Sequence, residues 1–404
     1  MFLFPKKKIV KFVGLNFIGN IISTLGTLYL TQIYSSHVFG EYAIFIANIS
    51  LLSVIATLRL NWAYQNTTLQ DDEQQVLTAN LTIGTLIPFF VLLILAAINK
   101  ITLLSSNILL LPFGLWLYSM VNVLDHVGMK KGKSIQLGRI KIVFFTTIIT
   151  LQILMFRIIG DTKESLIYAY TLSYLIVLII SATLLRDYLI LRKFTFKKIF
   201  KQHNRFILLS TPTSLFSTLA AELPNYLIKS FFSLELLGNY VVANRILKKP
   251  TSVIAESISK ALHPIIAKKK NSGRGNLNTI ITTIKVLGII SIIPAIGTLI
   301  YSEDIIIYLI GEKWKETGKI IIYLLPYFIS RFIFIPIRMS FQVYNKQGID
   351  LFLSIMNSLL VFFSFLIGLY FKNFYLGLLL FSISGTTILI IRILITIKTI
   401  KANN

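Results

Sequence analysis

Five basic side chains lie inside long apolar stretches in the second half of the chain: Arg245, Lys248, Lys249, Arg331 and Arg338. A charge at the centre of a lipid bilayer costs about 2.5 to 3.5 kcal/mol, so it normally faces protein or a water-filled cavity. Guanidinium and ammonium groups bind phosphate oxygens, and the guanidinium fork matches a pyrophosphate. These five residues therefore predict a wet, cationic site for a polyanionic group. The alternative is that such cations reach an interface or pair with intramembrane acids.

The spacing of these cations favours a shared site. Arg245 and Lys249 are one helical turn apart, where two like charges repel unless an anion or solvent separates them. Pro250 follows directly and is expected to break the helix. Arg331 and Arg338 are seven residues apart, about 10 Å along one stripe of a helix. Arg331 and Lys249 fit the interfacial alternative badly, because they lie deep within their apolar runs.

Two carboxylates, Glu222 and Glu256, also lie inside apolar runs. Glu222 could carry a coupling proton or could neutralise one of the nearby cations, and the sequence leaves both interpretations open. When the two repeats described below are aligned, Arg59 corresponds to the position next to Glu256. We therefore hypothesise that Arg59 and Glu256 pair across the two halves and close a cytoplasmic gate. Exchanging the two charges should then preserve transport that either single substitution abolishes.

Known motifs for covalent chemistry are missing from the sequence. It contains no GxSxG, no Walker loop, no HExxH and no glycine-rich dinucleotide turn. The acidic run Asp71-Asp72-Glu73 precedes an apolar run and is interpreted as a helix N-terminus. We therefore expect a transporter and not an enzyme, with no cofactor and no metal. A coupling ion, H⁺ or Na⁺, stays open.

The elements that must position these residues are membrane spans. The chain has 404 residues, of which 55 % are hydrophobic and 14 % charged, whereas a soluble domain has about 25 % charged residues. Its formal net charge of +24 would suggest nucleic acid in a soluble chain, but here the cations alternate with apolar runs, so no nucleic-acid partner is expected. Runs of about 20 apolar residues cross a bilayer as helices. The sequence has twelve such runs: residues 9–33, 38–60, 76–98, 103–124, 138–159, 165–185, 206–228, 238–262, 279–300, 319–342, 350–371 and 374–397. They predict an all-α integral membrane protein.

Lys and Arg residues between the spans predict its orientation. Of these residues, 23 fall on the side that holds the N-terminus and 7 on the opposite side. Because short basic loops stay in the cytoplasm, both termini should be cytoplasmic.

The two halves of the sequence repeat each other weakly. Phe39-Gly40-Glu41-Tyr42 corresponds to Leu237-Gly238-Asn239-Tyr240 at an offset of 198 residues, and Leu111-Pro112-Phe113 corresponds to Leu325-Pro326-Tyr327 at 214. An even number of spans separates the copies, so the repeats are parallel and related by an axis along the membrane normal. We therefore predict an N-lobe of residues 1–198 with spans one to six, and a C-lobe of residues 199–404 with spans seven to twelve.

Three stretches resemble a known family. They are HVFGEYAIFIANISLLSVIATLR, LELLGNYVVANRILKKPTSVIAESISKALHPIIAKK and IGEKWKETGKIIIYLLPYFI. In their order they are similar to the O-antigen and polysaccharide flippases of the multidrug/oligosaccharidyl-lipid/polysaccharide (MOP) exporter superfamily. The resemblance implies two six-helix lobes, as in the related MATE transporters, around a central cavity that opens alternately to the two sides. It implies residence in the bacterial cytoplasmic (inner) membrane.

The same resemblance implies the substrate and the partners. The substrate would be an oligosaccharide linked to undecaprenyl pyrophosphate, such as an O-antigen repeat unit for lipopolysaccharide, turned from the inner to the outer leaflet. Membrane lipids, a polysaccharide polymerase and the chain-length machinery are candidate partners. Arg245 resembles a position that peptidoglycan-precursor relatives use toward the pyrophosphate, and Arg59 matches their arginine in span two. Lys248 and Lys249 depart from the family pattern, which puts the shape of the cavity in doubt.

Other functions remain open. A flippase for the peptidoglycan precursor would fit the cationic interior, but that branch usually has two further helices. A membrane glycosyltransferase or polymerase that acts on the same lipid carrier would need a large outer loop or catalytic acids. A structural scaffold would not require Arg331 at the middle of the membrane.

Overall fold

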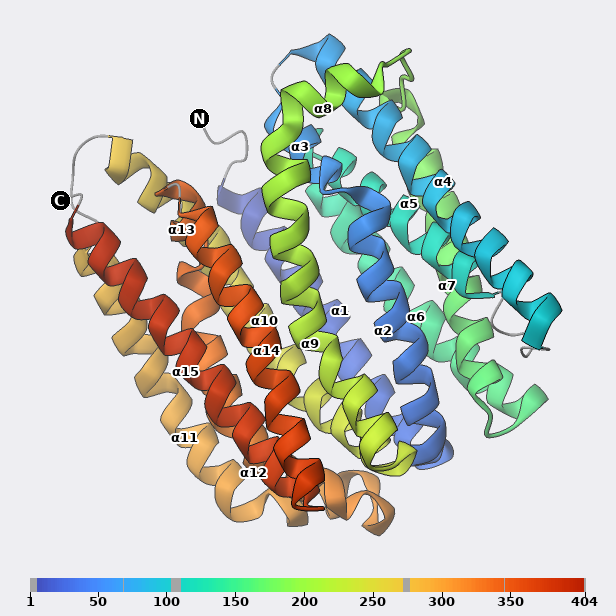
Figure 1. Cartoon of the computed structure of the whole chain (residues 1–404), viewed down its shortest axis with the longest axis vertical. Coiled ribbons are helices and arrows are strands. Elements are labelled where there is room, and N and C mark those ends of the chain that lie inside the picture. Colours follow the sequence, from blue (N-terminus) through green and yellow to red (C-terminus); the bar gives the residue numbers. More distant parts are fainter. Residues whose placement is uncertain (1–5, 68, 103–109, 272–276, 345, 403–404) are drawn as a thin grey trace. The chain divides into compact units, whose positions relative to one another are not determined.

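The computed structural model describes residues 6–67, 69–102, 110–271, 277–344 and 346–402. Over these ranges the chain is helical and contains no strand, which confirms the predicted all-α class (Figure 1). The α-helices are α1 Lys6–Ile33, α2 Ser36–Thr57, α3 Leu60–Asn66, α4 Gln70–Thr102, α5 Leu110–Lys130, α6 Ser134–Ile159, α7 Lys163–Leu185, α8 Phe196–Arg205, α9 Thr211–Phe231, α10 Leu234–Asn271, α11 Leu277–Ile310, α12 Lys315–Phe334, α13 Ser340–Val343, α14 Gln347–Tyr370 and α15 Phe374–Lys401.

Each of the twelve predicted apolar runs falls mainly within one of these helices, and twelve different helices are involved. Among the described residues, nine helical stretches are long and apolar enough to cross a membrane. The other three runs fall in α1, α5 and α10, which have 28, 21 and 38 residues, and about 20 residues suffice to span the hydrocarbon core. The start of the predicted span 103–124 lies outside the described residues. The protein is therefore a multi-pass membrane protein.

The outward faces of the helices carry large apolar side chains, as a lipid environment requires. In α11, Ile289, Ile293 and Ile300 are 67 %, 81 % and 63 % exposed and follow one another at helical spacing. Side chains at this spacing lie on one face of a helix. Exposing these apolar side chains to water would be unfavourable, whereas contact with lipid tails is not.

The second predicted span, residues 38–60, ends earlier than expected. The helix α2 stops at Thr57, because Leu58 and Arg59 adopt φ angles of 43° and 55°. This left-handed backbone is uncommon for residues other than glycine, and it turns the chain into the short helix α3. Arg59 thus lies at a sharp turn and not at the end of a continuous span.

The chain divides into two compact units. Unit 1 contains the chain up to Tyr34 and Glu41–Thr218, and unit 2 contains Ser35–Gly40 and the chain from Leu219. The division therefore differs from predicted lobes of residues 1–198 and 199–404 by two short segments. In unit 1, α8 packs against α4, and Lys198 Nζ lies 3.2 Å from Asp72 Oδ1. This packing places the loop after α7 and the start of α9 with the first unit.

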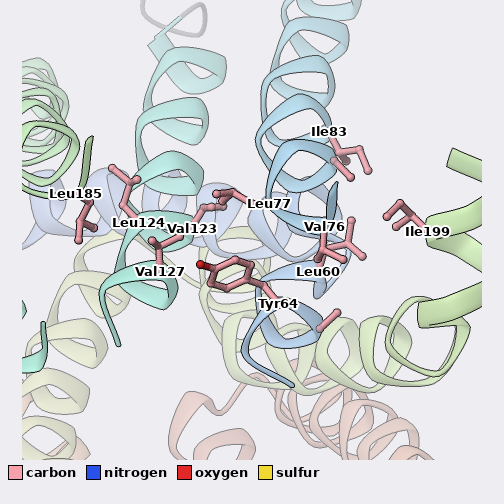
Figure 2. Close-up of a cluster of buried hydrophobic side chains, with 12 residues drawn as sticks. Leu60, Tyr64, Val76, Leu77, Ile83, Val123, Leu124, Val127, Leu185 and Ile199 are labelled. Atoms are coloured by element: carbon pink, nitrogen blue, oxygen red, sulfur yellow. The ribbon is translucent and has the colours of Figure 1, made fainter. Parts of the chain in front are cut away.

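Unit 1 has a hydrophobic cluster at the N-terminal end of α4. In Figure 2 the side chains of Leu60 and Tyr64 from α3 approach Val76 and Leu77 from α4, with Val127 from α5 beside them. All five are nearly or completely buried. The cluster joins five separate segments of the sequence, since Leu185 at the end of α7 and Ile199 of α8 also belong to it.

Unit 2 contains a reciprocal contact between the two repeats. A Cβ atom on Gly40 would overlap the carbonyl oxygen of Leu234, and a Cβ atom on Gly238 would overlap that of Ser36. Ser36 and Leu234 are separated by the same 198 residues as the two glycines. Each repeat therefore makes the same contact with the other, as two copies do about a twofold axis. Only glycine fits at these two positions.

Candidate functional site

The helix α10 of unit 2 presents three of the five predicted cations. Arg245, Lys248 and Lys249 all lie on this helix, which runs unbroken from Leu234 to Asn271. The expectation that Pro250 breaks the helix is therefore wrong. Hydroxyl groups donate to the carbonyl oxygens around the proline, from Thr251 Oγ1 to Leu247 at 2.6 Å and from Ser252 Oγ to Lys249 at 3.3 Å.

Lys248 is the centre of a charged group within unit 2. Lys248 is an exposed residue by its overall surface area, and its ammonium lies within electrostatic range of Arg331, Glu222, Glu256 and Arg245. These four side chains come from α12, α9 and α10, so helices distant in sequence converge here. Lys249 is an electrostatic neighbour of Arg245. The predicted residues Arg245, Lys248, Lys249, Arg331, Glu222 and Glu256 thus form one group, which we call the Lys248 group.

Aromatic rings flank the two guanidinium groups of the Lys248 group. The Cζ atom of Arg245 lies 5.6 Å from the ring centre of Phe39, and that of Arg331 lies 5.9 Å from the ring centre of Phe328. Phe39 in turn packs edge-on against Trp314, which is completely buried, with the ring centres 5.7 Å apart. Cation–π contacts of this kind attract and orient a guanidinium. Phe39 was not among the predicted site residues, although it directly precedes the repeat glycine Gly40.

Glu222 lies among the cations and is itself held in place. Asn225 Nδ2 donates a hydrogen bond to Glu222 Oε2 at 2.8 Å, one turn along α9. Tyr226 and Tyr240 are electrostatic neighbours of the same carboxylate. This environment suits a counter-ion to Lys248 and equally suits a carboxyl group that binds a coupling ion.

Arg338 lies in a different environment from Arg331. Between them α12 ends at Phe334, and Ile335–Ile337 form a 3₁₀ turn that contains Pro336. Because this turn interrupts the helix, the two arginines do not continue one α-helical stripe. Arg338 is exposed and is an electrostatic neighbour of Arg392.

Arg392 forms an ion pair that the sequence did not predict. Its Nη2 atom lies 3.1 Å from Asp350 Oδ1 and donates to Ser354 Oγ at 2.8 Å. The arginine comes from α15 and the other two residues from α14. Asp350 is the first residue of a predicted span, where the sequence suggests that an acidic side chain faces water. The only sequence signal was the presence of an arginine in the next span that needed a partner.

Arg59 lies in unit 1, whereas Glu256 belongs to unit 2. Arg59 Nε donates to Ser214 Oγ at 2.6 Å, and the guanidinium is an electrostatic neighbour of His126. Glu256 is exposed. The gate pairing of Arg59 with Glu256 stays a prediction.

Comparison with known proteins identifies the family. Residues 29–319 match a family model described as polysaccharide biosynthesis protein. No match is found among curated proteins.

Solved structures show the fold. The chain is similar to the lipid II flippase MurJ in an inward closed conformation, with a TM-score of 0.75 and 16 % identity over 96 % of this chain and 87 % of that one. It is similar to a multidrug resistance MATE family transporter of the MOP superfamily in its inward-facing conformation, with a TM-score of 0.69 and 14 % identity over 97 % and 94 %. A MOP superfamily transporter from Pyrococcus furiosus, described by the reverse polarity of its binding pocket, gives a TM-score of 0.66 and 14 % identity over 99 % and 96 %. The chain therefore belongs to the polysaccharide biosynthesis protein family and has the fold of the MOP superfamily transporters.

Proposed function

We propose that this protein is a flippase for a lipid-linked oligosaccharide. The substrate would be a repeat unit of O-antigen or of another surface polysaccharide on undecaprenyl pyrophosphate, carried from the inner to the outer leaflet of the bacterial cytoplasmic membrane. The Lys248 group carries the proposal. It combines four cations with two carboxylates, which leaves a formal excess of two positive charges. A pyrophosphate diester carries two negative charges, which match this excess.

The mechanism is physical and requires no covalent step. The lipid tail remains in hydrocarbon while the sugar and the phosphates pass through a hydrated path by alternating access. Each polar group that crossed lipid without a partner would cost several kcal/mol. Arg245 and Arg331 would replace the water around the pyrophosphate, and the rings of Phe39 and Phe328 beside them would orient their planar groups.

A second candidate is a flippase for the peptidoglycan lipid precursor. The similarity to MurJ, with its TM-score of 0.75, favours this candidate. Both substrates present a pyrophosphate between a polyprenyl tail and a sugar, so the Lys248 group would bind either. The two candidate substrates differ in their sugar, so the sugar that the protein accepts distinguishes them.

Purified protein in liposomes provides the test. We expect it to move a fluorescent polyprenyl-pyrophosphate oligosaccharide between leaflets without changing the mass of the lipid. A fluorescent peptidoglycan precursor, assayed in the same vesicles, distinguishes the two candidate substrates. A change of mass would instead reveal a glycosyltransferase or polymerase and would contradict the proposal.

The variants Arg245→Ala and Arg331→Ala test the site. We expect each to lower the rate of translocation by roughly tenfold or more, because a charge-assisted hydrogen bond contributes about 1.5 to 3 kcal/mol. Lys285→Ala is the matched control, since it removes an exposed cation from α11 outside the Lys248 group. Membrane insertion should be intact in all three. Equal loss in the control, or normal rates in both arginine variants, would remove the site assignment.

A further inference from the structure

Unit 1 has a basic recess at the end where its N-terminal helix begins. The recess has a volume of about 400 Å³ and is lined by Lys11, Lys131, Gly132, Lys133, Ile135, Gln136, Arg139 and Tyr188. These residues come from the start of α1, the turn between α5 and α6, the first turns of α6 and the segment that follows α7. We call it the α5–α6 recess. It shares no residue with the Lys248 group.

The charges of the α5–α6 recess are all positive. Four cations line it, Lys11, Lys131, Lys133 and Arg139, and no carboxylate is among the lining residues. Lys131 Nζ pairs with Glu73 Oε1 at 2.5 Å. In the part of the chain that the structure describes, Lys11, Lys133 and Arg139 have no carboxylate partner. Three uncompensated cations around one hollow attract an anion.

The backbone and one aromatic ring hold the α5–α6 recess open. Gly132 has a φ angle of 73° and ends α5 in a tight turn, which is closed by the Lys133 amide on the Gly128 oxygen at 2.8 Å. This left-handed position suits glycine. Lys133 Nζ lies 5.7 Å from the ring centre of Tyr188. The helix α6 then begins without a side-chain cap, so its N-terminal end adds positive potential to the recess.

An apolar stripe leads away from Lys11 along α1. Gly14, Ile18, Ile21 and Leu25 follow Lys11 at helical spacing, and the three large side chains are 47 %, 42 % and 60 % exposed, respectively. A Cβ atom on Gly14 would meet nothing within 4 Å. A charged recess that continues into an exposed apolar stripe matches the two parts of a phospholipid, and a free phosphate or a nucleotide would leave the stripe uncovered.

We propose that the α5–α6 recess binds the phosphate group of an anionic phospholipid, whose acyl chain lies along this stripe of α1. The excess of Lys and Arg on this side predicts that the recess lies at the inner leaflet, which is rich in anionic lipids. The bound lipid bridges α1, α6 and the end of α7. This site is independent of the transported substrate, so it can be tested without translocation.

The test uses the full-length protein in detergent, with bound lipid measured by native mass spectrometry. Phosphatidylglycerol and phosphatidylcholine are offered in equal amounts, and we expect the protein to retain phosphatidylglycerol. The double variant Lys133→Gln with Arg139→Gln should lower its retention roughly tenfold or more, because each cation near a lipid surface contributes about 1 kcal/mol. Lys133→Arg with Arg139→Lys keeps both charges and should retain the lipid.

A matched control separates the recess from general surface charge. Lys197→Gln with Lys201→Gln removes two exposed cations from α8, outside the recess, and should leave retention nearly unchanged. Gel-filtration profiles and thermal unfolding verify that each variant is folded. Equal losses in both double variants, or no preference for phosphatidylglycerol in the unchanged protein, would overturn the proposal. Displacement of the lipid by inorganic phosphate in excess would show a free-phosphate site and would overturn the lipid assignment.

Discussion

Glu73 at the start of α4 shows how a single carboxylate can join several segments of a membrane protein. Tyr64 OH donates to its Oε1 atom at 2.9 Å, Lys130 Nζ lies 3.0 Å from Oε2, and Lys131 Nζ lies 2.5 Å from Oε1. Lys130 Nζ also donates to the carbonyl oxygens of Tyr64 and Thr67 at 2.6 and 2.7 Å. The acidic run was correctly interpreted as a helix N-terminus, but the sequence did not show which cations it would meet.

Substitution of Glu73 by Gln tests this network. We expect Glu73→Gln to destabilise the protein by about 3 kcal/mol, because it leaves two largely buried ammonium groups without their carboxylate. Tyr64→Phe removes one neutral donor and should cost only about 1 kcal/mol. Thermal unfolding in detergent measures both. Equal midpoints for Glu73→Gln and the unchanged protein would show that solvent already compensates these charges.

At the scale of the element, α10 and α2 illustrate two different effects of helix-weakening residues. Pro250 does not interrupt α10, which continues on both sides of it, and hydroxyl groups of the following residues donate to nearby carbonyl oxygens. Gly40 and Gly238 lie where two backbones meet, and a side chain there would overlap a carbonyl oxygen. The sequence repeat located both glycines, but only the packing showed why each must be glycine.

Alanine substitutions distinguish the packed glycines from the others. Gly40→Ala and Gly238→Ala should each destabilise the protein by about 3 kcal/mol, since the added methyl group meets rigid backbone. Gly288 in α11 has nothing within 4 Å of its Cβ position, so Gly288→Ala should stabilise the helix by about 0.5 to 1 kcal/mol. Thermal unfolding midpoints should therefore move in opposite directions. A fall of equal size in all three variants would contradict the reciprocal contact.

At the scale of the whole molecule, the distribution of Lys and Arg predicts the orientation in the membrane. The chain contains no cysteine, so single cysteines can be introduced without a background. Lys372→Cys in the turn between α14 and α15 should react with a membrane-impermeant maleimide in intact cells. Lys197→Cys in α8 should react only after the membrane is permeabilised. The reverse pattern would invert the orientation, and labelling of both positions in intact cells would contradict the number of spans.

The sequence alone determined the helical class, the twelve spans and the expected sidedness, because hydropathy and loop charge are properties of contiguous residues. It also located most of the charged groups worth testing, since a cation within an apolar run is visible without a structure. Lys248 and Arg331 were identified in this way.

Only the tertiary structure decided which of these groups meet. The convergence of Glu222, Lys248 and Arg331, the separate environment of Arg338, the Arg392–Asp350 pair and the hollow of the α5–α6 recess all depend on contacts between separate helices. The physical reason is that side-chain contacts follow from the rotation and packing of whole helices. Apolar runs of similar composition, each compatible with many rotations, do not specify that packing residue by residue.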